Sequence, residues 1–455
     1  MTRPAPLVSL LLLVTAAACF IAWDQHLQLD ALAPTIRRVG LLSQENDALR
    51  TALATAQQEA ADAKNAVRRA QIERDTAAIR GLSFTSPVDY EVLDKAGIRQ
   101  VVAGKLSEIY TDQEIQNMAT GLSAFGLLPP NFPLKQTYIN LLGEQIAAFY
   151  DQHQHKLFMF RDASLENSQN RVILSHELTH ALQDQNFGLL KLPLEVKDDD
   201  DAAAAASALI EGDATLEMTQ YMQKDLSWQT FADTVTYSAT QSMVEIRKAP
   251  RYLRQMLVFP YVQGQQFCAA VYARGGFPAL SAVYADPPSS TAQILHPEKY
   301  FKETRENPIP VDFPDKTFQG QKPLADNVLG EMGCRLLFAQ ADADHADDIA
   351  AGWRGDRYLV FDQGKCLVWV SLWRSRQAAD AAAVVMARLC ENRFHSEAFG
   401  GAGGVASIAD TGPAWSVADM WQPSDYVSNE VVLILAPDKE SRKLLRQKFA
   451  EPSHG

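Results

Sequence analysis

The stretch RVILSHELTHALQDQNFG, from Arg171 to Gly188, decides how the central part of this chain folds. Its apolar residues fall on one face at helical spacing and a glycine closes it, so we expect a half-buried helix. His176 and His180 are four residues apart, so their side chains project from the same side of that helix, one turn apart. This spacing lets two imidazoles bind one tetrahedral zinc ion.

Glu177 follows the first histidine and can accept a proton from a water molecule on the metal. Histidine is scarce, with nine in 455 residues, so a chance HExxH match is expected in about one such chain in a hundred. The alternative is an ordinary amphipathic helix with surface histidines. We favour the metal site, because two histidines and a glutamate on a half-buried helix need a compensating interaction.

A third protein ligand is expected in SALIEGDATLEMTQYM, Ser207 to Met222. The acidic run Asp198–Asp201 predicts a helix start before it. Glu211 is the leading candidate, because a carboxylate on a second helix completes a two-histidine, one-glutamate site. Glu217 is a weaker rival, and Asp213 suits an outer role better than a ligand role.

The strings HELTHALQDQ and ALIEGDAT resemble the zinc helices of thermolysin-type gluzincin metallopeptidases, and a group of bacterial gluzincin-like proteins of poorly defined activity. The resemblance covers residues 140–300. It implies a mostly helical zinc domain, one zinc ion per chain, Glu211 as third ligand and peptide-bond hydrolysis with Glu177 as general base. The family has an aspartate where this chain has Thr215, so Asp184 and Asp213 are the candidates to support the ligands instead.

The metzincin pattern is absent, because Asn186 stands where that family has a third histidine. In gluzincins a downstream histidine or tyrosine often helps to stabilise the transition state, which makes His296 a catalytic candidate. The competing and favoured interpretation is a histidine that bonds within its proline-rich loop. Tyr237 and Tyr261 are further candidates without a local motif. His153 and His155 are expected to be exposed turn residues rather than ligands.

The N-terminal residues predict membrane targeting. Ala5–Trp23 is a run of nineteen uncharged residues, long enough as a helix to cross the hydrocarbon core. Arg3 precedes it, which favours a cytoplasmic N-terminus and a catalytic part outside the inner membrane of a bacterial envelope. A cleaved signal peptide, or a lipoprotein signal with Cys19 as the acylated residue, are the alternatives.

Residues 25–82 predict a coiled-coil stalk. From Leu42 to Ala77, apolar residues recur at alternating spacings of four and three, with Asn46 in the seam and Arg74 out of pattern. Such a seam favours a homodimer. The alternative is a single amphipathic helix that lies on the globular part. Pro34 is expected in the first turn of this helix.

The remaining chain predicts an α+β fold. Residues 88–312 form the zinc domain, with a short antiparallel sheet from the hairpin strands Ile146–Tyr150 and Lys156–Phe160. That hairpin edge can hold an extended peptide. Phe313–Lys322 reads as a linker. Residues 323–455 predict a small accessory α+β domain with an antiparallel sheet and tryptophans in its core.

Composition narrows the partners. The net charge is -13, which argues against nucleic acid as the main partner. The five cysteines contain no CxxC pair, so a cysteine zinc site is not expected. Four of them are expected to be free thiols, with disulfides as the alternative. The leading hypothesis is a membrane-anchored zinc metallopeptidase; the alternatives are an envelope scaffold or assembly factor with a peptidase-like fold, or a zinc hydrolase of a non-peptide amide or ester.

Overall fold

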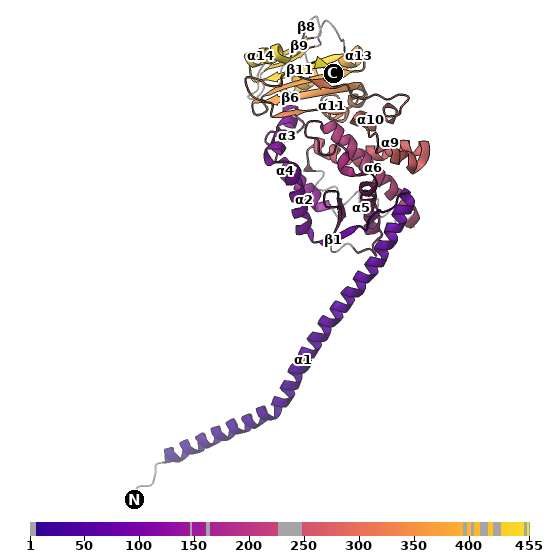
Figure 1. The fold of residues 1–455 in the computed structure, drawn as a ribbon. Helices are drawn as coiled ribbons and strands as arrows, with labels where there is room; N and C mark the ends of the chain where they lie inside the picture. Colours follow the sequence, from indigo (N-terminus) through magenta and orange to yellow (C-terminus); the bar gives the residue numbers. More distant parts are fainter. Residues whose placement is uncertain are drawn as a thin grey trace. The chain divides into compact units, whose positions relative to one another are not determined.

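The computed structural model describes nine stretches of the chain: residues 6–145, 148–160, 164–225, 248–394, 398–401, 405–409, 417–421, 429–449 and 453–454. The chain divides into two compact units, Met1–Ala70 and Gln71–Gly455. The α+β class expected from the sequence is confirmed, since long helices accompany separate sheets. The described residues of the first unit are all helical, and the second unit holds every sheet of the described chain (Figure 1).

Helix α1 runs from Pro6 to Arg80. It begins well before Pro34, which therefore lies inside the helix and not in its first turn as expected. In the described part of the chain, no helix combines the length and the apolar character needed to cross a membrane. The side chains of residues 6–22 lie outside that part, so the anchor at Ala5–Trp23 stays a prediction.

The last turns of α1 belong to the second unit. Ile72, Thr76 and Arg80 are fully buried there, whereas seam residues such as Leu49 and Leu53 are exposed. The helix therefore has two parts with different surroundings. The sequence predicts a stalk up to residue 82, but the first unit ends at Ala70. The final turns of α1 supply core residues to the second unit and so belong to it.

The second unit continues with helices that surround a small sheet. Their bounds are α2 (Lys95–Ile109), α3 (Asp112–Ala124), α4 (Leu134–Gln145), α5 (Ser168–Phe187), α6 (Asp200–Asp225), α9 (Arg251–Val283) and α10 (Thr291–Leu295). The small sheet has the order β1-β3-β2, with β1 (Asp89–Leu93), β2 (Ala148–Asp151) and β3 (Lys156–Phe160). The antiparallel hairpin of β2 and β3 is confirmed, but β1 pairs in parallel with β3, so this sheet is mixed.

Helix α5 contains the HExxH motif and is buried along most of its length. Asn167 caps its start and Gly188 ends it in the left-handed conformation at φ 74°. Leu174, Leu178 and Ala181 pack with the small sheet and with Ile72 of α1. His176 and His180 lie between these apolar positions on α5, and their side chains face Glu211 of α6.

Helices α6 and α9 cross closely because glycines stand at the crossing. A Cβ atom on Gly264 of α9 would collide with the backbone oxygen of Ala208 on α6, and a Cβ atom on Gly212 would collide with the backbone of Gly264. Ala208 and Leu209 are fully buried beside them. This contact fixes the rotation and height of α6, and with them the direction of Glu211.

Gly264→Ala is expected to destabilise the protein by about 1–3 kcal/mol, because a methyl group must force α6 and α9 apart. Gly104→Ala on α2 is the matched control, since nothing lies within 4 Å of a Cβ atom there. That control should be neutral or stabilising by up to about 1 kcal/mol. Urea unfolding measures both changes, and equal stability of the two variants would contradict the close crossing.

The C-terminal part of the second unit is built on a seven-stranded antiparallel sheet in the order β5-β6-β7-β11-β10-β9-β8. In Figure 1 this sheet lies at one end of the unit, and α5 with the small sheet lies toward the other. Its strands are β5 (Ala325–Asn327), β6 (Trp353–Phe361), β7 (Cys366–Trp373), β8 (Ala398–Gly401), β9 (Val405–Ala409), β10 (Val417–Trp421) and β11 (Glu430–Ala436). The accompanying helices are α11 (Gly330–Phe338), α12 (Ala346–Ala350), α13 (Arg376–Phe394) and α14 (Lys439–Phe449), and β4 (Val311–Asp312) pairs with β12 (Ser453–His454).

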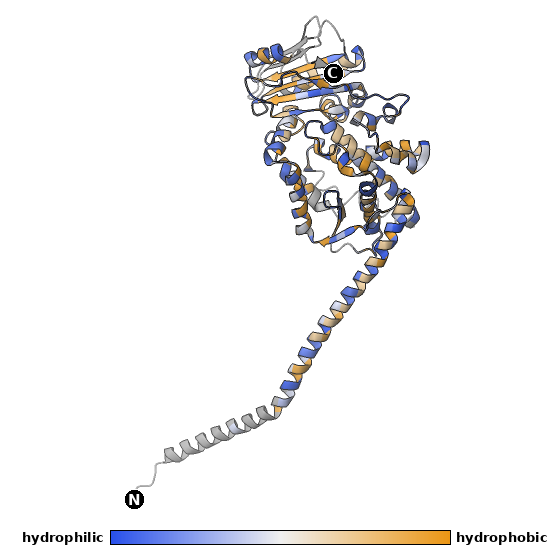
Figure 2. Ribbon diagram, in the orientation of Figure 1, coloured by the Kyte–Doolittle hydropathy of each residue, from blue (hydrophilic) through white to orange (hydrophobic). Residues whose placement is uncertain are grey.

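Both faces of the central strands are covered. Every residue of β7 and β11 is buried, and Figure 2 shows hydrophobic residues along these strands. One face joins the main helical core, and the other packs on Phe313, Phe318 and the α14 residues Leu445 and Phe449. The segment Phe313–Lys322 is therefore not a free linker as expected, because its two phenylalanines complete the second core.

Three tryptophans and four cysteines of the second unit are buried in its hydrophobic cores. Trp353, Trp369 and Trp373 are buried as expected, and the first two donate their indole N–H groups to the buried carboxylate of Asp356. The side chains of Trp415 and Trp421 lie outside the described residues. Free, buried thiols are confirmed at four positions: Cys268, Cys334, Cys366 and Cys390.

Candidate metal centre

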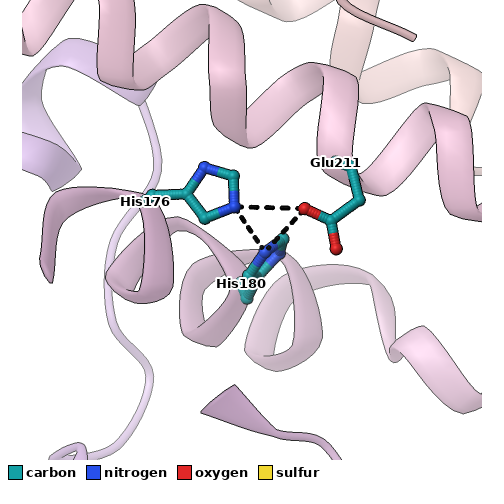
Figure 3. Close-up of side chains that lie close together, drawn as sticks. All are labelled: His176, His180 and Glu211. Atoms are coloured by element: carbon teal, nitrogen blue, oxygen red, sulfur yellow. Dashed lines mark hydrogen bonds and ion pairs between the residues drawn. The ribbon is translucent and has the colours of Figure 1, made fainter. Parts of the chain in front are cut away.

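Two histidines of α5 and one glutamate of α6 converge on one point (Figure 3). The Nε2 atoms of His176 and His180 are 3.1 Å apart. Oε2 of Glu211 lies 3.1 Å from Nε2 of His176 and 3.4 Å from Nε2 of His180. The structure thus brings together the three residues that the sequence predicts as metal ligands.

These separations fit a tetrahedral ion. Zinc binds histidine nitrogen and carboxylate oxygen at about 2.0–2.2 Å, which places neighbouring ligand atoms of a tetrahedron about 3.3 Å apart. The three measured separations lie on either side of that value. The imidazole rings of His176 and His180 are perpendicular, with an interplanar angle of 90°, so each ring can direct an Nε2 lone pair to the shared point. The donor set therefore fits a metal ion.

Gln183 sets the direction of His180. Nδ1 of His180 lies 2.9 Å from Oε1 of Gln183. The amide nitrogen of Gln183 donates to the backbone oxygen of Ile210 and to Oδ2 of Asp213, at 3.0 and 3.1 Å. A metal-binding histidine usually makes such a bond with its other ring nitrogen, which fixes its orientation.

Asp213 joins three elements behind Gln183. Besides the Gln183 amide, its carboxylate accepts from Nη2 of Arg80 at 3.0 Å and from the hydroxyl of Tyr284 at 2.8 Å. Asp213 and Arg80 are both fully buried. The outer role predicted for Asp213 agrees with this placement, since it reaches His180 through one intervening amide.

The other ring nitrogen of His176 has a different environment. Its Nδ1 is buried and has no hydrogen-bond partner among the described residues. The Oγ1 atom of Thr215 is also buried and has no hydrogen-bond partner among the described residues. Thr215 stands where the gluzincins, which the motif resembles, have a supporting aspartate. Direct support of a ligand histidine within the described chain is therefore confined to His180.

Glu177 lies beside the ligands and is held by β2. Its Oε2 atom accepts a hydrogen bond from the backbone N–H of Tyr150 at 2.9 Å. Burial raises the pKa of Glu177, against the opposing effect of His176 and His180. The carboxylate is therefore fixed in place and made more basic, which suits a group that accepts a proton.

Interactions among the side chains of the three candidate ligands shift the pKa values of His180 and Glu211. Burial disfavours charged His180, but the carboxylate of Glu211 raises the pKa of this histidine to about 9. The two histidines in turn hold the pKa of Glu211 far below its usual range, despite burial. A metal ion would take the place of the proton that this group retains.

Tyr261 of α9 completes the surroundings of His176. Its ring stacks on the imidazole, with centroids 6.1 Å apart and an interplanar angle of 28°. The negative charge of the Glu211 carboxylate raises the pKa of the Tyr261 hydroxyl well above its usual range. The tyrosine is also 44% exposed, so it borders both the ligands and the solvent.

Asp184 and Glu217 do not support the ligands. Asp184 accepts from the Tyr150 hydroxyl and the Leu189 N–H, and it contacts Nδ1 of His155 at 2.7 Å. It fastens the hairpin of β2 and β3 to α5, so its predicted role beside the metal is wrong in the described structure. Glu217 accepts from Thr179 and is not part of the cluster; burial raises its pKa well above the usual range.

The remaining histidine candidates also lie elsewhere. His296 follows α10 and contacts the fully buried Glu331 of α11 at 2.7 Å, so the structure does not bring it to the cluster as a catalytic group. His155 is exposed in the turn of the hairpin as expected, and His153 contacts Glu195 at 2.6 Å. Tyr237 lies outside the described residues.

Sequence reasoning did not identify Gln183, Arg80 or the N–H of Tyr150. Gln183 carried a usable signal, because it stands three residues after His180 and so lies on the same helical face. Arg80 carried none, since it is 133 residues from Asp213. The same holds for Tyr150, whose contribution comes from its backbone.

Comparison with known proteins covers only the C-terminal part. Residues 317–444 match a domain of unknown function, DUF8575. That range holds all seven strands of the large sheet and none of the metal cluster. No curated protein and no solved structure matches the chain.

Proposed function

We propose that this protein is a zinc-dependent metallopeptidase that hydrolyses peptide bonds, with Glu177 as the general base. One observation carries the proposal: three ligand atoms at tetrahedral spacing stand next to a carboxylate that is bound to a β-strand. Two histidines and one carboxylate leave a fourth position for water or substrate, as in catalytic zinc sites. When bound, zinc would supply a Lewis acid and a water that ionises near neutral pH.

The position of β2 at the edge of its sheet is a further reason to propose a peptide substrate. Among the residues that the structure describes, β2 is at the edge of its sheet and pairs with β3 alone. The N–H of Tyr150 binds Glu177 and not β3, so this edge faces the catalytic carboxylate. An extended chain that adds to the edge would carry its peptide bonds past Glu177, because strand addition aligns backbones in register.

The protein's own groups divide the chemistry. Glu177 accepts the proton of the attacking water, held at its position by the Tyr150 N–H, and then passes that proton to the leaving amine. The ring of Tyr261 stacks on the ligand His176, so its hydroxyl is our candidate donor to the oxygen that gains charge in the transition state. This assignment replaces His296.

A defined assay tests the proposal. The full chain, purified with zinc, is incubated with a library of unmodified peptides, and cleavage is followed by mass spectrometry. We expect cleavage that stops after zinc is removed by a chelator and resumes after zinc is restored. If zinc binds but no peptide is cleaved, while amide or ester substrates are, the peptidase assignment fails and a different hydrolase remains.

We extend the proposal to the N-terminal region. The apolar run Ala5–Trp23 anchors the chain in the inner membrane of a bacterial envelope with the zinc site outside the cytoplasm, and residues 42–77 pair with a second copy. The exposed Leu42, Leu49 and Leu53 support pairing, because a stripe of leucines is unfavourable in water. Sedimentation of the full chain in detergent should give a dimer that Leu49→Asp converts to a monomer; a monomeric wild type would contradict the pairing.

A further inference from the structure

Arg80 is the last residue of α1, and its charged side chain lies in the protein interior. Its side chain is fully buried. Nη2 donates to Oδ2 of Asp213 at 3.0 Å, Nε lies 2.8 Å from Oδ1, and Nη1 donates to the hydroxyl of Ser281 at 3.0 Å. The guanidinium carbon is 4.8 Å from the centre of the Phe277 ring. Burying a charged side chain costs desolvation free energy, which specific contacts such as these must offset. Arg80 is therefore not an incidental packing residue.

Arg80 makes the Asp213 side chain a hydrogen-bond acceptor. A guanidinium is always protonated and can only donate hydrogen bonds. Asp213 contacts this guanidinium and also accepts hydrogen bonds from Gln183 and Tyr284. Both oxygens of the Asp213 side chain lie against guanidinium nitrogens, so this side chain acts as an acceptor.

An acceptor at this position determines which way the Gln183 amide points. Asp213 and the backbone oxygen of Ile210 both accept, so they take the two N–H groups of the amide. Oε1 of Gln183 must then face Nδ1 of His180, at 2.9 Å. Since an amide oxygen cannot donate, Nδ1 must carry the proton. Nε2 of His180, which faces His176 and Glu211, is then the nitrogen that can offer a lone pair to a metal ion.

We propose that Arg80 is a positioning residue of the metal site, acting through Asp213 and Gln183 to hold His180 in the tautomer that binds metal. The inference rests on the proposed zinc site. It also makes the end of α1 part of that site, although Arg80 lies far before the HExxH motif in the sequence. Residues 71–80 are then required for full metal affinity.

The test measures the zinc dissociation constant of the full chain by competition with a chelator. Arg80→Met combined with Asp213→Leu removes both charges, so that neither is left buried alone. This double variant is expected to bind zinc about 10- to 100-fold more weakly, the usual effect of losing a partner of a metal ligand. Gln183→Met should give a loss of similar size.

A cycle of variants separates positioning from general stability. Adding Gln183→Met to the double variant should weaken zinc binding no further, because all three residues act along one chain of bonds. Arg80→Lys keeps a buried cation at Asp213 and should retain affinity near that of the wild type. The control pair Arg357→Met and Asp326→Leu removes another ion pair, at 2.5 Å on the large sheet, and should leave zinc affinity unchanged.

Three results would overturn the inference. They are wild-type affinity in the double variant, a further loss on adding Gln183→Met, and a loss in Arg80→Lys as large as in the double variant. Gln183→Met and Arg80→Lys keep the test decisive if the double variant does not fold. A wild-type chain that binds no zinc at all would instead refute the proposed function, so the two failures are distinguishable.

Discussion

Glu177→Gln is expected to lower peptide hydrolysis by about 10²- to 10⁴-fold, the usual contribution of a positioned general base, while zinc binding is retained. Glutamine has nearly the size of glutamate, and its carbonyl oxygen can still accept the N–H of Tyr150, which Oε2 of Glu177 accepts at 2.9 Å. What it cannot do is take a proton. The variant therefore removes the base and leaves the ligand atoms of His176, His180 and Glu211 in place.

The measurement pairs initial rates of peptide cleavage with zinc content on the same preparation. Glu108→Gln is the matched control, because this glutamate is exposed on α2 and should keep the wild-type rate. The prediction also separates an enzyme from a scaffold, since a scaffold with a peptidase-like fold does not need the base. Full hydrolysis by a zinc-loaded Glu177→Gln variant would remove Glu177 from the mechanism.

The second large effect concerns the free energy of unfolding. Arg80→Met is expected to destabilise the folded unit by about 3–5 kcal/mol, because it leaves the charge of Asp213 buried without its partner. Asp213→Leu should cost a similar amount for the converse reason. Both residues are fully buried, with the guanidinium Nε 2.8 Å from Oδ1, so water cannot compensate either loss.

The double variant gives this prediction its sharpest form. Replacing both residues with apolar ones removes the unpaired charge, and much of the lost stability should return. Guanidinium unfolding of the two single variants and the double variant measures the coupling between them. Destabilisation by the single variants that simply adds in the double variant would show that the pair does not interact as the structure describes.

The sequence predicted the part of the site that depends on helical spacing. His176 and His180 lie on one face because they are one turn apart, and Glu211 followed from the need for a third ligand on the next helix. The sequence also predicted the strand pair around residues 151–155 and the buried strand β11. Both rest on local patterns of apolar residues along the chain.

The rest depends on contacts between distant segments. Arg80 meets Asp213 only after α1 packs against α6, and Tyr261 reaches Glu211 only because glycines let α9 approach α6. Asp184 was a candidate to support the ligands because it stands one helical turn after His180, but its carboxylate accepts from the hairpin residue Tyr150 instead. The segment after Phe313 resembled a linker because its two phenylalanines are separated by turn-forming residues, and only the sheet shows what they cover.

The central claim is that His176, His180 and Glu211 bind one zinc ion. The most direct measurement is the metal content of the purified full chain by inductively coupled plasma mass spectrometry, beside that of Glu211→Gln, with thermal unfolding to show that both are folded. We predict one zinc per wild-type chain and loss of stoichiometric zinc in the variant, because an amide is a poor ligand where a carboxylate is required. A folded wild type without bound metal, or a variant that keeps its full zinc content, would contradict the account.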